Sequence, residues 1–347
     1  MKKELKSITL LLKHSKHEHI VFHLSLEDFL SAGSENVSIS IGGKKVSLTR
    51  DFFIALSKNQ VLNNGAKKWG LKLGAGKVVA GTDINSMMKS VKELNAEGIG
   101  ATIDNLGEFV YSREEALEAK ANVLETLEAI QQHGVAAHMS IKLTQVGLDV
   151  DYNFCLENMK EIAGAAANYA IFVNIDMEDY SHLQPTLNIL HELLKDFDNV
   201  GTVIQSYLYR SEKDLESLEN VRLRLVKGAY KEISEVSYQS KQDIDNNYLK
   251  LIKIRLQQDG FTSIATHDHV IIHEVKKFAK ENNIPRDRFE FQMLYGFRTE
   301  MQKELAQEGY TFTTYVPFGQ DWYGYYMRRL AERPQNINLA LKSLVSK

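Results

Sequence analysis

The sequence predicts an α/β fold closed into a (β/α)8 barrel. Between residues 100 and 316, eight short apolar runs, most of them rich in β-branched or aromatic residues, alternate with charged stretches of mostly helical period. Strands that alternate with helices form a parallel sheet, and eight such units are the number that closes a barrel. The 347 residues accommodate one barrel of about 250 residues with extensions. An open doubly wound sheet of eight strands fits the same pattern and stays an alternative.

Residues 1–46 differ in composition from the rest of the chain and are treated as an N-terminal extension. They are rich in His and Lys, and an alternating stretch at 37–41 precedes a Gly42-Gly43 turn signal. These features predict either a small hairpin or a poorly ordered leader, with no assigned chemistry. The second domain, residues 47–347, is expected to begin with two helical regions, 49–62 and 85–96.

The predicted strands follow these helices in order. They occupy residues 100–106, 136–143, 170–177, 201–208, 223–228, 263–267, 289–294 and 311–316. Between the first two strands, residues 114–132 carry Ala116, Val123, Leu127 and Ile130 at helical spacing. The other intervals are also charged and are expected to be mostly helical.

Composition and charge narrow the class of protein. The net charge of −3 gives no electrostatic argument for binding nucleic acid. The single cysteine, Cys155, excludes an intramolecular disulfide, lies in an amphipathic stretch and is predicted to pack in the core. No apolar run approaches the ~20 residues of a membrane-spanning helix, and the run at 8–12 is too short for a signal peptide. We therefore expect a cytoplasmic protein without stable membrane insertion.

Three basic residues of the predicted strands draw attention, because active sites of these barrels lie at the C-terminal ends of the strands. Lys142, Arg224 and Lys227 lie among apolar residues and are expected to point into the barrel. A buried cation requires an anionic partner, and we expect an anionic cofactor or substrate to supply part of it. The Lys227-Gly228-Ala229 turn lets the backbone approach a pyrophosphate closely.

The pair Arg328-Arg329 lies on a Tyr-rich helical segment after the last strand. A guanidinium is permanently charged, and its planar fork matches a carboxylate. At 100° per residue, Tyr325, Arg329 and Glu332 share one face of this helix, which predicts a site for a small carboxylate-bearing substrate. An ordinary solvated amphipathic helix is the alternative.

A metal site and a dinucleotide fold are less well supported. His267-Asp-His269 at a strand end resembles the ligand pattern of some barrel hydrolases. Only one strand has that pattern, however, and His138 is expected to face away from the strand ends, so we expect no metal. A metal-dependent barrel hydrolase or lyase stays an alternative. No Gly-x-Gly-x-x-Gly follows a strand, so a Rossmann site is not supported.

Several longer motifs, taken together and in order, resemble those of the proline dehydrogenases, in particular the monofunctional bacterial type. The resemblance spans residues 47–344, nearly all of the chain. The motifs are Ile-Asp-Asn-Leu-Gly-Glu, Ile-Lys-Leu-Thr-Gln, Val-Asn-Ile-Asp-Met-Glu, Val-Ile-Gln-Ser-Tyr, Arg-Leu-Val-Lys-Gly-Ala-Tyr, Ala-Thr-His-Asp, Glu-Phe-Gln-Met-Leu-Tyr-Gly and Tyr-x-x-Arg-Arg-Leu-Ala-Glu-Arg.

The resemblance implies a distorted (β/α)8, TIM-like barrel with N-terminal helices and a last helix over the barrel mouth. It also implies non-covalent FAD and oxidation of L-proline to Δ1-pyrroline-5-carboxylate, the first step of proline catabolism to glutamate. Hydride would pass to flavin N5 and electrons to a membrane quinone. The protein would then contact the inner face of the cell membrane peripherally. A non-catalytic amino-acid-binding barrel that keeps the same clamp is the remaining alternative.

The resemblance also implies roles for individual residues. Lys142, Arg328 and Arg329 would clamp the substrate carboxylate, and Glu108 would pair with Arg328. Asp176 and Arg224 would act at the reacting centre, with Arg224 near flavin N5. The site around the ring would be shaped by Tyr230, Leu294, Tyr315 and Tyr325. The flavin, its ribityl chain and its phosphates would be held by Met177, Gln205, Lys227, Gly228, Ala229, Thr266 and His267. Tyr315 would crowd a 4-hydroxyl group, which favours proline over hydroxyproline.

Overall fold

The computed structural model describes residues 7–15, 18–25, 38–41, 44–47, 75–107 and 110–332, with side chains described between residues 75 and 329. It consists of two compact units, one formed by residues 77–320 and the other by residues 1–76 with 321–347. The first unit contains the barrel. The helical region predicted at 49–62 lies outside the described residues.

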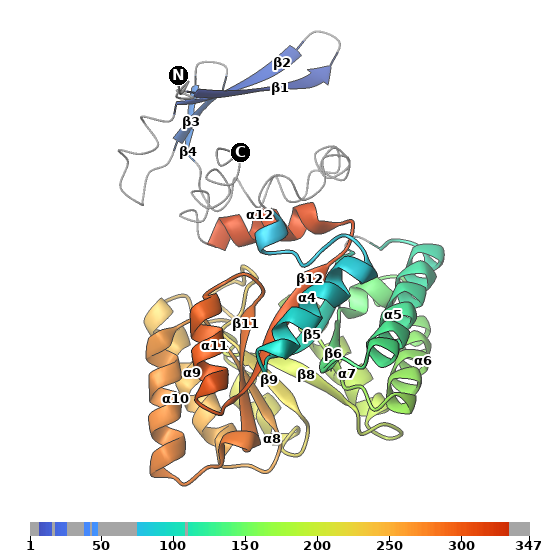
Figure 1. Ribbon diagram of the computed structural model, residues 1–347, viewed down its shortest axis with the longest axis vertical. Helices are drawn as coiled ribbons and strands as arrows, with labels where there is room; N and C mark the ends of the chain where they lie inside the picture. The colour runs from blue at the N-terminus through green and yellow to red at the C-terminus, as the bar shows by residue number, and fades with distance from the viewer. Residues whose placement is uncertain are drawn as a thin grey trace. The chain divides into compact units, whose positions relative to one another are not determined.

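Eight parallel strands close into a barrel (Figure 1). In chain order they are β5 (Gly100–Asn105), β6 (Ala137–Ile141), β7 (Val173–Ile175), β8 (Val200–Gln205), β9 (Leu223–Val226), β10 (Thr262–Ala265), β11 (Phe289–Leu294) and β12 (Thr311–Phe318). The barrel closes where β12 pairs with β5, with Thr313 opposite Gly100 and Tyr315 opposite Thr102. The predicted barrel is confirmed, and the open-sheet alternative is wrong.

Helices follow the strands around the outside of the barrel (Figure 1). They are α4 (Ile84–Ala96), α5 (Arg113–His133), α6 (Tyr152–Asn168), α7 (Tyr180–Leu193), α8 (Ser211–Glu216), α9 (Lys241–Leu256), α10 (His269–Glu281) and α11 (Thr299–Gln307), with short 3-10 turns η2 (Ala75–Lys77), η3 (Leu143–Val146) and η4 (Arg286–Arg288). The helices predicted at 85–96 and 114–132 correspond to α4 and α5.

Polar caps determine where several of these helices begin. Asp179 accepts hydrogen bonds from the backbone N–H groups of Ser181 and His182 and so begins α7. Ser112 and Glu115 form a capping box at the start of α5, and Gly134 ends that helix in the left-handed conformation. Strand β7 is shorter than predicted, because the chain leaves α6 through Ala170 at φ 54° and pairs only from Val173.

Alternation along the strands separates two kinds of side chain. Apolar residues such as Ile103, Met139 and Phe291 are fully buried in the cluster that also holds helical residues such as Leu127. Cys155 belongs to this cluster and is fully buried, so its predicted core position is confirmed. The alternate strand positions carry polar residues whose hydrogen bonds cross the barrel interior.

The second unit is described in part. Strands β1 (Ser7–Ser15), β2 (Glu18–Ser25), β3 (Ser38–Ile41) and β4 (Lys44–Ser47) form an antiparallel sheet in that order. Ile41 pairs with Lys44 across β3 and β4, as expected of a small hairpin. Helix α12 (Trp322–Glu332) also belongs to this unit. The division at residue 46 stays a prediction.

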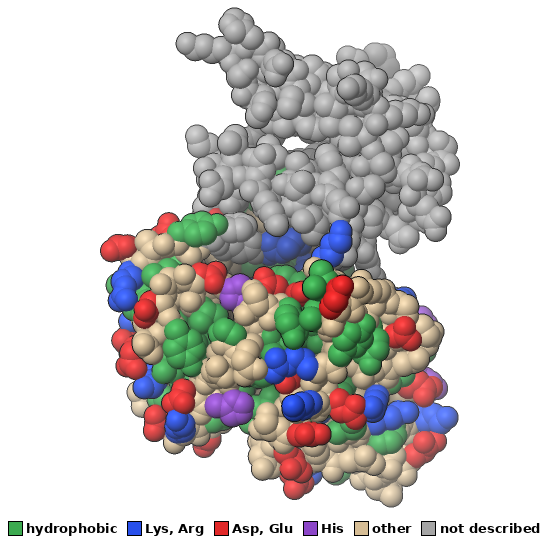
Figure 2. All heavy atoms as spheres, turned by 180° about the vertical axis from the view of Figure 1, so that it is seen from behind, with side chains coloured by type: hydrophobic (Ala, Val, Ile, Leu, Met, Phe, Trp, Pro, Cys, Tyr) green, Lys and Arg blue, Asp and Glu red, His purple; other side chains and the backbone are tan. Residues whose placement is uncertain are grey.

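The described surface gives two simple results. Acidic and basic side chains are interspersed over the face of the barrel unit that Figure 2 shows. None of the helices in the described ranges has both the length and the hydrophobicity needed to span a bilayer.

Candidate active site

Five ionisable or hydroxyl side chains meet inside the barrel at the C-terminal ends of its strands, and we call them the strand-end cluster: Asp104, Lys142, Asp176, Arg224 and Tyr315. Asp104 lies on β5 and Tyr315 on β12, while Lys142 and Asp176 directly follow β6 and β7. Arg224, near the start of β9, reaches them with a long side chain. Four of the five were predicted site residues, and the structure brings those four together.

Asp176 is the centre of this cluster. Its Oδ1 accepts hydrogen bonds from Arg224 Nη1 at 2.7 Å, Ser140 Oγ at 2.6 Å and Asn174 Nδ2 at 3.1 Å. Its Oδ2 accepts from the Tyr315 hydroxyl at 2.8 Å and from Lys142 Nζ at 3.4 Å. Burial alone would raise the pKa of Asp176, but the charges of Lys142 and Arg224 outweigh it and lower that pKa. Asp176 is therefore firmly ionised.

Lys142 donates to three acceptors of the protein itself. Its Nζ lies 3.0 Å from Asp104 Oδ2, 3.4 Å from Asp176 Oδ2 and 3.3 Å from the Tyr315 oxygen. Burial opposes its charge, yet the neighbouring Asp104 and Tyr315 groups raise the pKa of Lys142 well above its ordinary value. Burial and the two carboxylates likewise raise the pKa of Tyr315. The lysine is charged and the tyrosine is neutral.

Arg224 is 5% exposed and spans the interior. Besides Asp176, its guanidinium donates to Ser140 Oγ and, through Nη2, to Thr102 Oγ1, each at 3.0 Å. Its Cζ also lies 5.3 Å from the centre of the Tyr315 ring, as a cation–π contact. The buried Nε has no hydrogen-bond partner in the structure. One donor of this guanidinium therefore stays available.

The three predicted cations Lys142, Arg224 and Lys227 have acidic partners within the protein itself. Lys142 pairs with Asp104 and Asp176, and Arg224 pairs with Asp176. Lys227, just after β9, pairs with Asp245 at 2.5 Å and with Asp268 at 3.2 Å. Acids far apart in the sequence reach these cations only because the sheet is closed, so uncompensated charge does not argue for an anionic ligand.

The residues predicted to hold a cofactor lie at or just after the ends of β7, β8, β9 and β10, apart from Arg224 within β9. Gln205 donates through Nε2 to the carbonyl of Glu178 at 3.0 Å, while its buried Oε1 has no partner. Gly228 has φ 114°, and a Cβ there would lie 2.4 Å from the Tyr207 ring, so only glycine fits. The backbone N–H of Leu294 donates to His267 Nε2 at 3.1 Å.

The remaining predicted residues are located as follows. Met177 is 7% exposed and Thr266 is likewise buried, whereas Tyr230 is 39% exposed. Ala229 lies between Gly228 and Tyr230 in the turn after β9. Tyr325, Arg328 and Arg329 lie on α12, where Arg329 Cζ stacks 5.2 Å from the Tyr325 ring centre. Their part in the site stays a prediction, and Glu108 and the Glu332 side chain lie outside the described residues.

The metal hypothesis gains no support from the geometry. Within the described ranges, no group of three or more His, Cys, Asp or Glu side chains is arranged to hold a metal ion. His267 Nε2 accepts the Leu294 hydrogen bond, and His269 is the first residue of α10. Burial and the charge of Arg222 lower the pKa of His138 to about 3, and His138 lies near the other end of the barrel, as expected.

Sequence reasoning missed four polar partners of the site. Asp104, Ser140 and Asn174 stood at predicted strand ends but were assigned no role, and Thr102 was not singled out. Thr102 and Asp104 on β5, and Ser140 on β6, occupy alternate positions within apolar runs, which is the pattern of inward-facing side chains. That alternation was the available signal.

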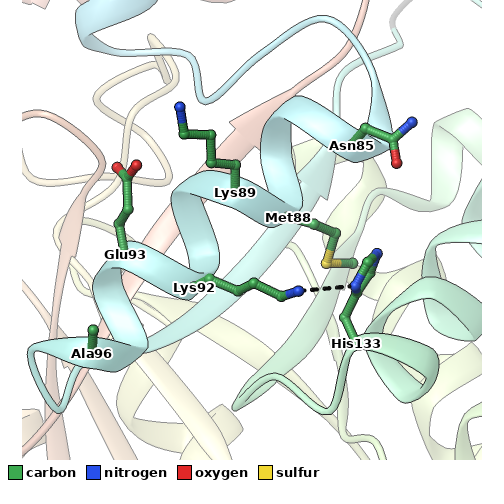
Figure 3. A pocket seen from close by; sticks show the side chains of 7 residues that line it. All are labelled: Asn85, Met88, Lys89, Lys92, Glu93, Ala96 and His133. Atoms are coloured by element: carbon green, nitrogen blue, oxygen red, sulfur yellow. Dashed lines mark hydrogen bonds between the residues drawn. The ribbon is translucent and has the colours of Figure 1, made fainter.

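A separate hollow lies on the outside of the barrel unit. It is lined by α4 residues and by His133 at the end of α5, and Figure 3 shows Lys92 Nζ directed at His133 Nδ1, 3.1 Å away. None of the predicted site residues lines it. It is open to solvent, and we assign it no function.

A closed parallel barrel with buried ionisable groups at the C-terminal ends of its strands has the architecture of a barrel enzyme. The proline dehydrogenase family model matches residues 87–339. The chain therefore belongs to the proline dehydrogenase family, and it is an oxidoreductase.

Named relatives agree with this assignment. Proline dehydrogenase 2 of Bacillus subtilis is 46% identical over 302 residues, covering 86% of this chain and 100% of the relative. Proline dehydrogenase of Deinococcus radiodurans is 41% identical, covering 80% of this chain and 91% of the relative.

A solved structure shares the fold. Proline utilization A (PutA) from Bdellovibrio bacteriovorus, inactivated by N-propargylglycine, superposes with a TM-score of 0.71 at 25% identity. The match covers 82% of this chain and 36% of that one, so the chain spans about a third of the length of that PutA.

Proposed function

We propose that this chain oxidises L-proline to Δ1-pyrroline-5-carboxylate with FAD as hydride acceptor, and that a membrane quinone reoxidises the flavin. Family membership supports the reaction class. The observation that carries the proposal is the strand-end cluster, in which two cations, two carboxylates and a tyrosine hydroxyl meet at the end of the barrel where such enzymes react.

The fit of FAD can be tested on buried polar atoms. Gln205 Oε1 is an acceptor and Arg224 Nε a donor, and both are buried without a partner. Such atoms are costly unless something completes them, and the edge of a flavin ring offers both donors and acceptors. The residues present therefore fit the cofactor. The cofactor would be held by Met177, Gln205, Arg224, Lys227, Gly228, Ala229, Thr266 and His267.

When bound, FAD would accept hydride from the substrate. The protein's part is to bind and orient the imino acid and to keep charge close to the reacting centre. We propose that Lys142, Arg328 and Arg329 bind the carboxylate, while Tyr230, Leu294, Tyr315 and Tyr325 surround the ring. The Tyr315 hydroxyl is held between two carboxylates, and in this proposal it would crowd a 4-hydroxyl group on the substrate ring. We therefore favour L-proline over hydroxyproline.

The existing contacts of Lys142 limit how it can bind the substrate carboxylate. An ammonium has three hydrogens, and all three have acceptors in the strand-end cluster. Binding of a substrate carboxylate by Lys142 therefore requires one of these contacts to loosen. Ligand binding and rearrangement of the cluster are coupled for this reason.

The test is a visible absorption spectrum. Purified protein should show a bound flavin that bleaches when L-proline is added without oxygen. A protein that takes up no FAD would refute the proposal, and bound flavin that proline fails to reduce would leave only an amino-acid-binding barrel. Reoxidation by membrane vesicles with and without quinone tests the proposed acceptor and the proposed peripheral contact.

Replacing Arg329 with Met tests the carboxylate clamp. A hydrogen bond to a charged group contributes about 1.5–3 kcal/mol, so the KM for proline should rise roughly ten- to over a hundredfold while flavin stays bound. Arg288→Met, on the surface turn η4, is the control and should keep the wild-type KM. An unchanged KM in the Arg329 variant would refute the clamp.

A further inference from the structure

The Tyr315 hydroxyl contacts two carboxylate oxygens but has only one hydrogen to donate. Its oxygen lies 2.7 Å from Asp104 Oδ2 and 2.8 Å from Asp176 Oδ2. A tyrosine hydroxyl has one hydrogen, and an ionised carboxylate can only accept. With both acids ionised, Tyr315 can donate to only one of them, so the other short contact becomes a hydrogen bond only when a carboxyl group carries a proton and donates to the Tyr315 oxygen.

The surroundings of the two carboxyl groups decide which one carries this proton. Asp176 accepts from Arg224, Ser140, Asn174 and Lys142 in addition to Tyr315, and each donor favours its ionised form. Asp104 accepts only from Lys142 and Tyr315, and its Oδ1 has no hydrogen-bond partner although the residue is 1% exposed. Asp104 is therefore the carboxyl group that has an oxygen available to carry the proton.

The charges of the cluster give this proton a function. Lys142 and Arg224 balance Asp104 and Asp176 when both acids are ionised, so the strand-end cluster is neutral without a ligand. A bound carboxylate adds a negative charge next to Lys142, and a nearby like charge favours the protonated form of a carboxyl group. Protonation of Asp104 restores the balance and also releases Lys142 from its shortest ion pair, at 3.0 Å.

We infer that Asp104 is the proton-exchanging group of the strand-end cluster, and that it takes up one proton when a carboxylate ligand binds. This inference deepens the proposed function and rests on it for the class of ligand.

Each of the other strands that contribute to the strand-end cluster places a charged or hydroxyl group near Asp104. Lys142 after β6 and Tyr315 on β12 contact it directly. Asp176 after β7 faces it across the Tyr315 hydroxyl, and Arg224 on β9 lies over the Tyr315 ring. Asp104 thus acts on the ligand through Lys142 and Tyr315, which makes it a positioning residue whose protonation state changes on binding.

The test measures binding of an anion that has a ring and a carboxylate but no amine. The flavin-loaded enzyme is titrated with cyclopentanecarboxylate between pH 6 and pH 9, in phosphate and in Tris, whose different ionisation heats report proton uptake in calorimetry. In the wild type, affinity should fall with rising pH by up to about tenfold per pH unit, with matching proton uptake.

Three variants sharpen this test. Asp104→Asn mimics the protonated acid and should bind the anion with no dependence on pH and no proton uptake. Tyr315→Phe should move the pH range over which affinity changes, because it removes one hydrogen bond to Asp104. Glu290→Gln changes a buried carboxylate elsewhere in the barrel and should keep the wild-type dependence. Thermal melting checks that each variant is folded.

The outcomes separate this inference from the proposed function. A wild type whose affinity is independent of pH, or that does not bind the anion, would overturn the inference. So would an unchanged pH dependence in Asp104→Asn or, if that variant does not fold, in Tyr315→Phe. Failure of proline to bleach the flavin would instead overturn the proposed function, whatever the anion titrations show.

Discussion

Two buried carboxylate clusters occupy the interior of this barrel, and they differ in how completely they are satisfied. The strand-end cluster contains Asp104, whose Oδ1 has no partner. The second, which we call the basal cluster, consists of Glu290 with Arg222, Ser263, Gln292 and Thr313. There Glu290 Oε1 accepts from Arg222 at 3.0 Å and Gln292 at 2.7 Å as well as from Ser263, and Oε2 accepts from Thr313 at 2.6 Å.

The position of each cluster along the strands explains the difference. Glu290 is the second residue of β11 and pairs with Ser263 across β10, near the N-terminal end of the barrel. Arg222 is sandwiched there between the rings of Phe172 and Phe261, at 4.3 and 4.6 Å. The partnerless atoms of this cluster are Arg222 Nε and Gln292 Oε1, neither of them on a carboxylate. We therefore expect the basal cluster to contribute mainly to the stability of the barrel, and the strand-end cluster, which has a carboxylate oxygen without a partner, to respond to a ligand.

The largest expected effect comes from removing the centre of the strand-end cluster. Asp176→Ala leaves Arg224 and Lys142 without their shared carboxylate. Lys142 and Arg224, which are proposed to act on the substrate, each lose a hydrogen-bonded charge contact that contributes about 1.5–3 kcal/mol, so kcat/KM for proline should fall by at least about a hundredfold. Steady-state kinetics measure it, with flavin content reported separately. An activity near that of the wild type would contradict the role of this cluster in the reaction.

Removing the centre of the basal cluster should separate stability from activity. Glu290→Ala removes a buried carboxylate and leaves the partly exposed Arg222 charge without its partner, so it should destabilise the fold by up to about 3–5 kcal/mol. The folded fraction should keep its KM for proline, because Glu290 lies outside the strand-end cluster. Denaturant melts and kinetics at low temperature measure the two quantities. A raised KM in the folded variant would contradict the proposal that the basal cluster affects stability and not substrate binding.

A smaller, pH-dependent effect is expected at the start of α7. His182 Nδ1 contacts Asp179 at 2.7 Å and Nε2 contacts Asp149 at 2.8 Å. Burial lowers the pKa of His182, but the hydrogen bonds to Asp149 and Asp179 outweigh it, and the pKa is raised above 6.5. A raised pKa in the folded state stabilises the protein below the unfolded value, and this contribution is lost as pH rises through the folded value.

Replacing His182 with Gln tests that sign. The wild type should melt at a higher temperature than the variant near pH 6, and the difference should shrink as the pH rises above neutrality. His191→Gln, on the last turn of the same helix, is the control. A difference between wild type and His182→Gln that grows with pH would show that the two carboxylates do not stabilise the charged imidazole.

The smallest expected effect concerns the lone cysteine. Burial, followed by the nearby Glu178 and Asp149 charges, raises the pKa of the Cys155 thiol to about 12. The reactive thiolate is therefore scarce at pH 8, and a thiol reagent should label the native protein negligibly. One thiol should react in denaturant. Rapid labelling of folded protein would contradict the core position.

Much of the candidate site could be predicted from the sequence. Lys142 and Arg224 stood out as basic residues among apolar strand residues, Asp176 and Tyr315 were named through the family resemblance, and the structure brings these four within contact distance. Asp104 has the same local signature but gained no role, because its importance depends on two partners 38 and 211 positions away. Sequence pattern shows that a residue faces inward, but not which inward residues meet.

The structure decided that the sheet closes into a barrel. The sequence by itself determined the eight strands, the core position of Cys155 and the family. These follow from local patterns of apolar residues and from motifs that are continuous along the chain. Only the tertiary structure decided which acid neutralises which cation, because ion pairs such as Arg224 with Asp176 form between strands that closure brings face to face. It also decided that one carboxylate would stay incompletely satisfied, since that depends on every neighbouring donor at once.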